Sequence, residues 1–498
     1  MKNLLRALVL LISFTAVGQS EAEKAASTIT KSDIEGQIYF LASDELKGRQ
    51  TGSDEIKIAS AYLANTLRKH NVKPAGKDGS FYQNVPMEKV MPPSNISLQI
   101  NEIKGDKFLA ISVENIAFKG EAIYLDYGSS DDFKSHNVKG KLVITKAGTP
   151  ETKNPMAKLR AGRAKRQLAD SLGASGLIEL IEIEDGMYDR YAHYFNEPKT
   201  GLKSNVEATK KFVHLYMVDK GLENAAKLAA SKALKADFNI EGVATKQISC
   251  RNVVGYMEGS DPKLKDEFII YSAHYDHVGI GKPNAENDSI YNGARDNAVG
   301  SVTVLSVAEN FNKYPTKRSA LFLFFTGEEK GLLGSKYYSE NPLLPLDKMV
   351  YCFNSDNAGY NDTSKITIFG LNRTTVGHHI VAAAEEFDLT AIDDPAPEQG
   401  LFDRSDNVNF AKKGIPSPTY SLGFNAFDDE INKYYHQVTD NPDNMDYDYL
   451  VKFFKSYVLS SRLIANDPKT PFWTEGDKYY DAGVALYKEK AEETTVLD

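Results

Sequence analysis

The pattern of apolar and polar residues changes twice along the 498-residue chain. Residues 32–70 repeat apolar side chains at helical spacing, and the acidic residues within 53–55 are typical of the first turn of a helix. From about residue 81 to residue 245, short alternating segments such as ISLQI and GKLVITKAG predict β-strands. From residue 248 onward, apolar runs alternate with helical stretches. These changes predict a helical start, a β-rich middle and an α/β remainder.

The last part of the chain carries the clearest strand signals, in the segments RNVVGYMEG, FIIYSAH, SALFLFFT, MVYCFNSD, KITIFG and SPTYSLG. Helical stretches such as AVGSVTVLSVAENFNKY separate several of them, and strands that alternate with helices form largely parallel sheets. We therefore expect an α/β fold with a mostly parallel central sheet covered by helices on both faces. A long helix at 447–464 should precede a polar tail that holds the only tryptophan, Trp473.

The first 20 residues have the layout of a secretory signal peptide, with Lys2 and Arg6, then an apolar run, then small and polar residues. The apolar run, residues 7–17, is shorter than the roughly 20 residues that span a bilayer. No cysteine follows it to carry a lipid anchor. We therefore expect an exported protein, periplasmic or secreted, without a stable membrane anchor.

The composition is that of an ordinary globular protein, with 42% hydrophobic and 26% charged residues. The net charge of −9 argues against nucleic acid as a partner, because phosphate binding requires a basic surface. The two cysteines, Cys250 and Cys352, stand in strand-like contexts that favour buried free thiols as much as a disulfide. The fold should not depend on a disulfide.

Side chains of the metal-binding type recur where the predicted strands end. The candidate ligands are, in chain order, His274, Asp296, Glu329, Asp356 and His436. Three of them follow the apolar strands FIIYSA, LFLFFT and MVYCFNS, and the other two stand in the loops NGARDNAVG and KYYHQVTD. Each alone has an ordinary explanation; Asp296, for example, stands where it would cap a helix. Because open α/β sheets place their chemistry beyond the carboxyl ends of parallel strands, the set predicts one site there.

Two histidines and three carboxylates suit a pair of Zn²⁺ ions. Crowded together without metal, the carboxylates would repel one another and be costly to bury. Two cations about 3.5–4 Å apart promote amide hydrolysis, since they lower the pKa of bound water and polarise the carbonyl. Adjacent residues at a strand exit point in different directions, so Glu329 can bind metal while Glu328 reaches the water as general base. Asp276, two residues after His274, is placed to hold the orientation of its ring.

The motifs HYDHVG, GARDNAVG, FFTGEEKGLLGS, FNSDNAG and YYHQVTD resemble, in this order, those of the di-zinc aminopeptidase family. That family includes bacterial leucyl and Streptomyces-type aminopeptidases, with glutamate carboxypeptidase II and the transferrin receptor as relatives. The resemblance implies that Asp296 bridges two zinc ions. One zinc site would be completed by His274 and Asp356. The other would be completed by Glu329 and His436.

The same resemblance implies that Glu328 is the general base that later protonates the leaving amine, and that Asp276 is the outer partner of His274. Between the two matching parts, 32–95 and 248–464, the phrase NVKGKLVIT and a helix ending in GASGLIEL resemble a protease-associated domain. The implied domains are a signal peptide at 1–20, N-terminal helices of the peptidase domain at 21–94, a protease-associated-like insertion at 95–245 and the zinc peptidase domain at 246–498.

One motif departs from the family pattern. Where many members read SDH, this chain has Ser405-Asp406-Asn407, and no tyrosine stands just before it. The departure leaves open which group stabilises the oxyanion. For the neighbouring Arg404, we favour an ion pair with Asp403 or Asp406 over a contact with substrate.

Three further histidines receive no metal in this interpretation. His277, beside the predicted site, is read as structural. His378 and His379 are consecutive on a predicted helix and should not share a face as a metal pair.

The expected function is that of a zinc-dependent exopeptidase acting on peptides, with an aminopeptidase favoured. A carboxypeptidase or dipeptidase on the same fold stays open, and a requirement for a free amine would separate them. Glutaminyl cyclisation uses one zinc, so two zinc ions per chain would argue against it. A non-catalytic, receptor-like binding protein would have lost ligands, whereas this chain retains all five and Glu328.

Overall fold

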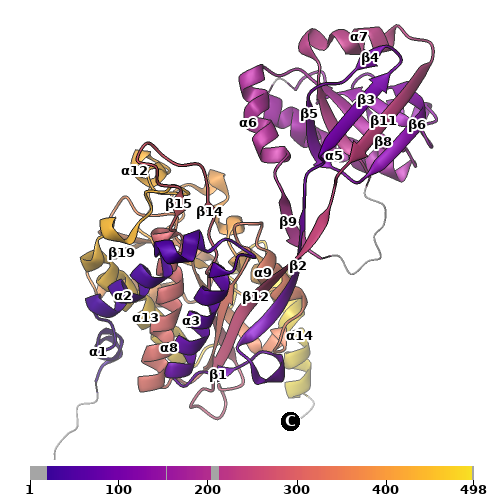
Figure 1. Cartoon of the computed structure of the whole chain (residues 1–498). Coiled ribbons are helices and arrows are strands. Elements are labelled where there is room, and N and C mark those ends of the chain that lie inside the picture. Colours follow the sequence, from indigo (N-terminus) through magenta and orange to yellow (C-terminus); the bar gives the residue numbers. More distant parts are fainter. Residues whose placement is uncertain (1–18, 153, 204–211, 496–498) are drawn as a thin grey trace, which may run out of the picture. The chain divides into compact units, whose positions relative to one another are not determined.

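The computed structural model describes residues 19–152, 154–203 and 212–495 (Figure 1). The chain forms two compact units, unit 1 from Met1–Val85 with Cys250–Asp498 and unit 2 from Pro86–Ser249. The predicted signal peptide lies almost wholly outside the described residues. Within the described part of the chain, no helix has both the length and the apolar character that crossing a bilayer requires.

Unit 1 is built on a mixed sheet with a parallel centre. Its strands run in the order β19-β18-β20-β17-β13-β16-β12-β2, and β1 pairs with β12. Pairing is parallel from β20 through β17 and β13 to β16, and antiparallel where β12 joins β16 and where β18 joins β20. The bounds are β1 Lys73–Pro74, β2 Tyr82–Val90, β12 Thr245–Met257, β13 Phe268–His274, β16 Ser319–Phe325, β17 Met349–Ser355, β18 Lys365–Phe369, β19 Thr390–Asp393 and β20 Thr419–Leu422. The expected parallel order therefore holds in the centre of the sheet, next to antiparallel flanks.

Helices cover both faces of this sheet because successive strand residues point to opposite sides. In β13, Ile269 and Tyr271 enter one hydrophobic cluster, whereas Ile270 enters another. The first cluster packs under α2 Lys31–Leu41, α3 Glu55–Lys69, α8 Gly300–Lys313, α10 Gly377–Glu385 and α13 Tyr447–Asn466. The second receives residues from α9 Leu333–Glu340, α11 Asn407–Ala411 and α14 Tyr480–Thr495. The near-continuous apolar runs of the central strands follow from this burial on both sides.

The C-terminal region differs from the expected polar tail, because it forms α14. Trp473 is 1% exposed, and its indole N–H donates to the Gly414 carbonyl over 2.8 Å. Tyr487 of α14 donates its hydroxyl to the Met349 carbonyl over 2.6 Å. The helix was missed because few of its residues are apolar, and those few are held by contacts with distant parts of the chain.

The N-terminal segment joins unit 1 through a buried arginine. After α1 Glu21–Ala26 and α2, the short helix η1 Asp44–Arg49 ends at Arg49, which is 1% exposed. Its guanidinium donates to the carbonyls of Leu41, Tyr275, Asn292 and Gly293. Because these carbonyls belong to three separate segments, one side chain fixes the N-terminal loop to the ends of the sheet.

Unit 2 contains a second sheet, in the order β4-β3-β11-β6-β7-β8-β10-β5. Its strands are β3 Asn95–Ile100, β4 Ile103–Lys104, β5 Phe108–Ser112, β6 Ile116–Tyr124, β7 Leu142–Lys146, β8 Gly176–Ile181, β10 His214–Val218 and β11 Leu234–Glu241, and β9 Lys199–Leu202 pairs with β2 instead. Its helices are α4 Ser130–Ser135, α5 Pro155–Ser171, α6 Asp185–Phe195 and α7 Glu223–Ala229. The sheet is parallel from β6 through β10. The resemblance of this region to a protease-associated domain stays a prediction.

Candidate metal centre

The five predicted ligands converge at the carboxyl ends of the parallel strands of unit 1. His274 is the last residue of β13, and Asp356 directly follows β17. Glu329 stands in the loop after β16, and Asp296 stands in the turn Ala294–Val299 that leads into α8. His436 follows the short helix α12 Asp429–Asn432. The sheet therefore brings together side chains that lie up to 162 positions apart in the sequence.

Asp296 lies at the centre of the group, with its two carboxylate oxygens facing different partners. Its Oδ1 is 3.2 Å from His274 Nε2, which is also 3.2 Å from Asp356 Oδ1. Its Oδ2 is 3.2 Å from His436 Nε2, which is also 3.2 Å from Glu329 Oε2. One carboxylate thus joins two sets of donor atoms, as a bridging ligand does. The two sets match the pairing that the family resemblance implies.

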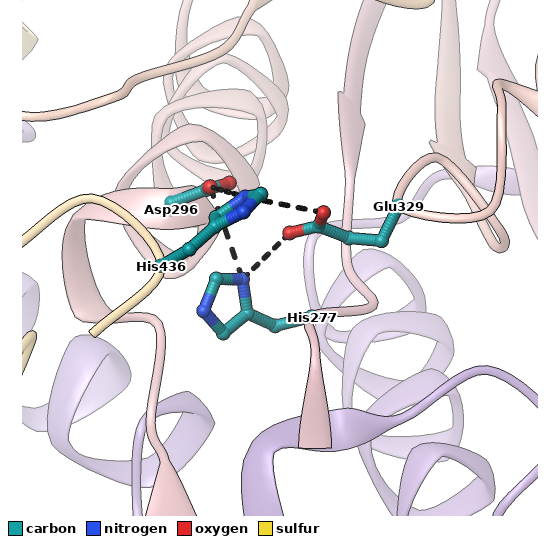
Figure 2. A group of neighbouring side chains, drawn as sticks. All are labelled: His277, Asp296, Glu329 and His436. Carbon is teal, nitrogen blue, oxygen red and sulfur yellow. Dashed lines mark ion pairs between the residues drawn. The ribbon is translucent and has the colours of Figure 1, made fainter. Parts of the chain in front are cut away.

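A sixth side chain, His277, completes one of the two sets (Figure 2). Its Nδ1 lies 2.8 Å from Glu329 Oε1 and 3.9 Å from Asp296 Oδ2. The ring is 0% exposed. The sequence analysis placed His277 beside the site but did not anticipate that its ring would face two of the predicted ligands. The available signal was its spacing, since it follows His274 by three positions directly after the strand.

The donor atoms fit zinc. Tetrahedral Zn²⁺ with ligand distances of about 2.0–2.1 Å places neighbouring donors about 3.3 Å apart, close to the 3.2 Å contacts around Asp296. His277 Nδ1 and Glu329 Oε1 are buried and face each other over 2.8 Å, and neither makes a hydrogen bond of regular geometry to the described residues. Buried polar atoms without partners are costly, and a shared cation would satisfy both. Neutral imidazoles and carboxylates are also the ligand types that zinc prefers.

Asp276 organises the backbone around the centre. The Nδ1 of His274 is 3.1 Å from the main-chain carbonyl of Asp276 and 3.9 Å from its Oδ1. That Oδ1 accepts the backbone N–H of Glu328 over 3.1 Å, and Oδ2 accepts the hydroxyl of Thr51 over 2.7 Å. The residue is 0% exposed, and burial raises the pKa of its carboxyl above the ordinary value. Asp276 thus touches the ring of one ligand and the loop that carries Glu328.

Glu328 differs electrostatically from the ligands beside it. Burial, together with the negative charges of Asp356 and Asp406, raises the pKa of Glu328 well above its usual value, although His274 acts in the opposite direction. A carboxyl group with a raised pKa is suited to accept a proton and return it at near-neutral pH. Glu328 also lines the cleft that contains the ligands, so it is open to a substrate.

The candidate ligands shift the pKa values of one another. Burial alone would lower the pKa of His436, but its contacts with Asp296 and Glu329 raise that pKa to about 10. Burial likewise opposes ionisation of Glu329, yet its pKa is lowered to about 2, with His277 and His436 as the stabilising partners. Because zinc binds neutral imidazole, loading the centre would release a proton from His436.

The cleft over the centre has an acidic floor and an apolar wall. Its apolar lining comes from Phe369, Leu401, Phe424, Phe427 and Tyr435. Arg404 lines it as well, without the expected ion pair to Asp403 or Asp406. Asp403 is instead bound by Lys478 and by the hydroxyl of Tyr479. Asp406 is 0% exposed, and among the described residues its carboxylate oxygens make no hydrogen bond of regular geometry.

A separate group of ligand-type side chains lies at the start of α10. The rings of His378 and His379 lie 4.0 Å apart between centroids, and both group with Asp467. The expectation that consecutive histidines would point apart was therefore wrong, because it assumed regular helical geometry at a helix end. The contact between His379 Nε2 and Asp467 Oδ2, at 2.6 Å, accounts for this pair as an ordinary interaction.

Comparison with known proteins identifies the domain that carries the centre. Residues 252–459, which include every ligand and Glu328, match the family model described as Peptidase family M28. This part of the chain is therefore similar to peptidase family M28. The motifs that suggested a di-zinc aminopeptidase family thus lie inside the matched range, whereas Thr51 and Arg49 lie outside it.

Several proteins that the chain resembles are aminopeptidases by name. Aminopeptidase Y of Saccharomyces cerevisiae is 25% identical over 298 residues, which cover 56% of this chain and 50% of that protein. Aminopeptidase YwaD of Bacillus subtilis is 28% identical over 203 residues, covering 40% of each. The chain thus spans half or less of the length of these relatives.

A solved structure shows the same fold over more of the chain. The aminopeptidase from Aneurinibacillus sp. strain AM-1 has a TM-score of 0.60 at 19% identity, covering 90% of this chain and 97% of that one. At this identity, the likeness concerns the fold alone. The mixed α/β architecture with helices on both faces is therefore shared beyond the M28 match.

Proposed function

We propose that this protein is an exported zinc-dependent aminopeptidase that releases N-terminal residues from peptides and holds two Zn²⁺ ions per chain. One observation carries the proposal, namely that the two oxygens of Asp296 face two separate sets of donors. The names of its relatives support the choice of aminopeptidase. The apolar run at the N-terminus of the sequence supports export.

The ligand roles follow from the contacts. His274, Asp296 and Asp356 would hold one ion, while Asp296, Glu329 and His436 would hold the other. Bound zinc would supply a Lewis acid for the scissile carbonyl and lower the pKa of the attacking water. Asp276 would keep His274 and the Glu328 loop in position through its carbonyl and carboxylate.

Glu328 would move the proton that the reaction requires. It takes one proton from the attacking water as the new C–O bond forms. It then delivers that proton to the amide nitrogen as the C–N bond breaks, so the products are a free amino acid and the shortened peptide. The water's oxygen stays in the new carboxylate, and its other proton passes to the released amine or to solvent. The acidic floor of the cleft would hold the free α-ammonium group of the substrate.

The test is Glu328→Gln, assayed with a panel of aminoacyl-amide reporter substrates and with their N-acetylated forms. We expect the variant to keep its zinc content and to lose turnover by about 10²–10⁴-fold, the usual share of a general base. Chelation should abolish wild-type turnover, and zinc should restore it. Glu309→Gln, a partly buried glutamate on α8 outside the centre, is the matched control and should behave as wild type.

Two results would contradict the proposal. Hydrolysis of N-acetylated peptides as fast as free ones would favour a carboxypeptidase or another hydrolase without a free-amine requirement. Wild-type zinc binding without turnover of any peptide would favour a binding protein on the same fold.

A further inference from the structure

The two sets of donors around Asp296 are unequal. The set with His274 and Asp356 offers three protein ligands, whereas the set with Glu329, His436 and His277 offers four. Figure 2 shows these four side chains gathered together, with dashed lines joining the Glu329 carboxylate to both His277 and His436. The family resemblance assigns only three ligands to this set, so it does not explain why His277 lies among them.

The surroundings hold the His277 ring in this position. Its backbone N–H donates to the Arg49 carbonyl over 3.3 Å, so the buried arginine loop fixes the main chain. Gly293, at a φ of +63°, packs so closely against the ring that a Cβ there would lie 2.6 Å from His277 Cγ. Among the described residues, neither ring nitrogen makes a hydrogen bond of regular geometry, and Nδ1 faces only the carboxylates of Glu329 and Asp296. A fully buried imidazole, held rigidly and directed at a carboxylate oxygen 2.8 Å away, is prepared for a cation.

We propose that His277 is the fourth protein ligand of the zinc site formed with Asp296, Glu329 and His436, and that this site therefore fills before the other. The proposal rests on the proposed metal centre but not on peptidase activity. A site with four protein donors satisfies tetrahedral zinc completely, whereas a site with three keeps an open position. The second role is suited to the ion that meets the substrate.

The experiment loads the whole protein with one Zn²⁺ per chain and counts imidazole ligands by X-ray absorption. We expect two imidazoles per zinc in the wild type, from His277 and His436, and one in His277→Leu. The variant should also bind its first zinc at least roughly tenfold more weakly, because even the loss of a side chain that only supports a ligand weakens metal binding by this much. His70→Leu removes another buried histidine as the matched control and should leave the count at two.

A wild-type count of one imidazole would overturn the proposal, and so would an unchanged count in His277→Leu. His277→Asn, which places an amide oxygen near the position of Nδ1, guards against a folding defect in the leucine variant. It should melt like the wild type and show one imidazole. None of these measurements depends on turnover, so a failure of the aminopeptidase proposal leaves them intact.

A different observation concerns Arg404, which lines the cleft without an ion pair or hydrogen bond to the described residues. Every other arginine described in unit 1 donates at least one hydrogen bond to a carboxylate, carbonyl or hydroxyl oxygen. The guanidinium of Arg404 instead lies over the ring of Phe427, 5.9 Å from its centroid. It is exposed, and it is the only lysine or arginine among the described residues that line the cleft.

The residues just before Arg404 are held in place by packing. Phe402, two positions earlier, is 7% exposed and packs against Trp473, and Arg373 stacks over it at 3.7 Å. We further infer, on the basis of the proposed peptidase function, that Arg404 binds a carboxylate of the substrate in this cleft. The carboxylate would be either the C-terminus of a short peptide or an acidic side chain. Arginine is the residue best shaped to bind a carboxylate through two parallel hydrogen bonds.

Binding to the zinc-loaded Glu328→Gln variant tests this inference without turnover. The three probes are Leu-Gly, with a free C-terminus, Glu-Gly amide, with an acidic side chain, and Leu-Gly amide, with neither. Adding Arg404→Gln should weaken one of the two carboxylate probes by roughly 10–100-fold, the equivalent of one hydrogen bond to a charged group. The affected probe identifies the source of the carboxylate.

Binding of Leu-Gly amide should be unchanged in Arg404→Gln. The control variant Lys478→Gln removes a cation that binds Asp403 outside the cleft lining, and it should leave the binding of all three probes unchanged. Equal weakening of all three probes by Arg404→Gln would overturn the inference in favour of a structural or carbonyl-binding role. Unchanged binding of both carboxylate probes would overturn it as well.

Discussion

The hydroxyl of Thr51 offers a sharp test of how the N-terminal segment supports the metal centre. It donates to Asp276 Oδ2 over 2.7 Å, and both residues are buried, at 8% and 0% exposure. Thr51→Val replaces this hydroxyl with a methyl group of nearly the same shape. The substitution therefore removes one donor without opening a cavity.

The expected magnitude follows from the charge of the acceptor. A hydrogen bond to a charged group contributes about 1.5–3 kcal/mol, and its loss leaves a buried carboxylate oxygen without a partner. The same carboxylate accepts the backbone N–H of Glu328 and lies beside His274, so the disturbance reaches a proposed ligand and the proposed general base. Loss of such an outer contact typically weakens metal binding about 10–100-fold. We expect Thr51→Val to fall in this range.

The assay is competitive zinc titration against a chelator, together with thermal unfolding of the zinc-free protein. Thr51→Ser keeps the hydroxyl and should restore most of the zinc affinity. If Thr51→Val binds zinc as tightly as the wild type and unfolds at the same temperature, Thr51 has no supporting role. A loss shared equally by the valine and serine variants would attribute the effect to packing.

Two further predictions concern buried titratable groups. Burial lowers the pKa of His70 from 6.5 to about 4. As the pH falls, the unfolded chain therefore takes up this proton before the folded protein does. The stability of the folded protein should fall as the pH drops from about 6.5 through about 4. His70→Leu should flatten the decline in melting temperature over that interval; an equally steep decline would remove His70 as its cause. Cys250 and Cys352 are both free and buried, and burial raises the pKa of each thiol to about 12. We expect two thiols to react with Ellman's reagent after unfolding without reductant, and slow reaction before; fewer than two would indicate a disulfide.

The sequence alone predicted the elements of unit 1 that depend on local pattern. The apolar runs that became β13, β16 and β17 are buried on both faces, which is why they read as continuous rather than alternating. Their ends carried the ligands, because parallel strands deliver their carboxyl ends to a single edge. The choice of residue types was therefore enough to predict that five side chains of the metal-binding type would meet at one edge of the sheet. The helix α14 escaped prediction, since its stability comes from contacts with distant strands and loops.

Only the tertiary structure decided how those members face one another. Which oxygen of Asp296 meets which histidine depends on the turn before α8, and no periodicity in the sequence encodes that orientation. Nothing in the sequence indicated that His277 would lie against the carboxylate of Glu329. Arg404 stands among acidic neighbours in the sequence, yet Asp403 turns toward Lys478 and leaves it unpaired. Local patterns reflect the burial of each element, whereas the partners of a side chain depend on how distant segments close on one another.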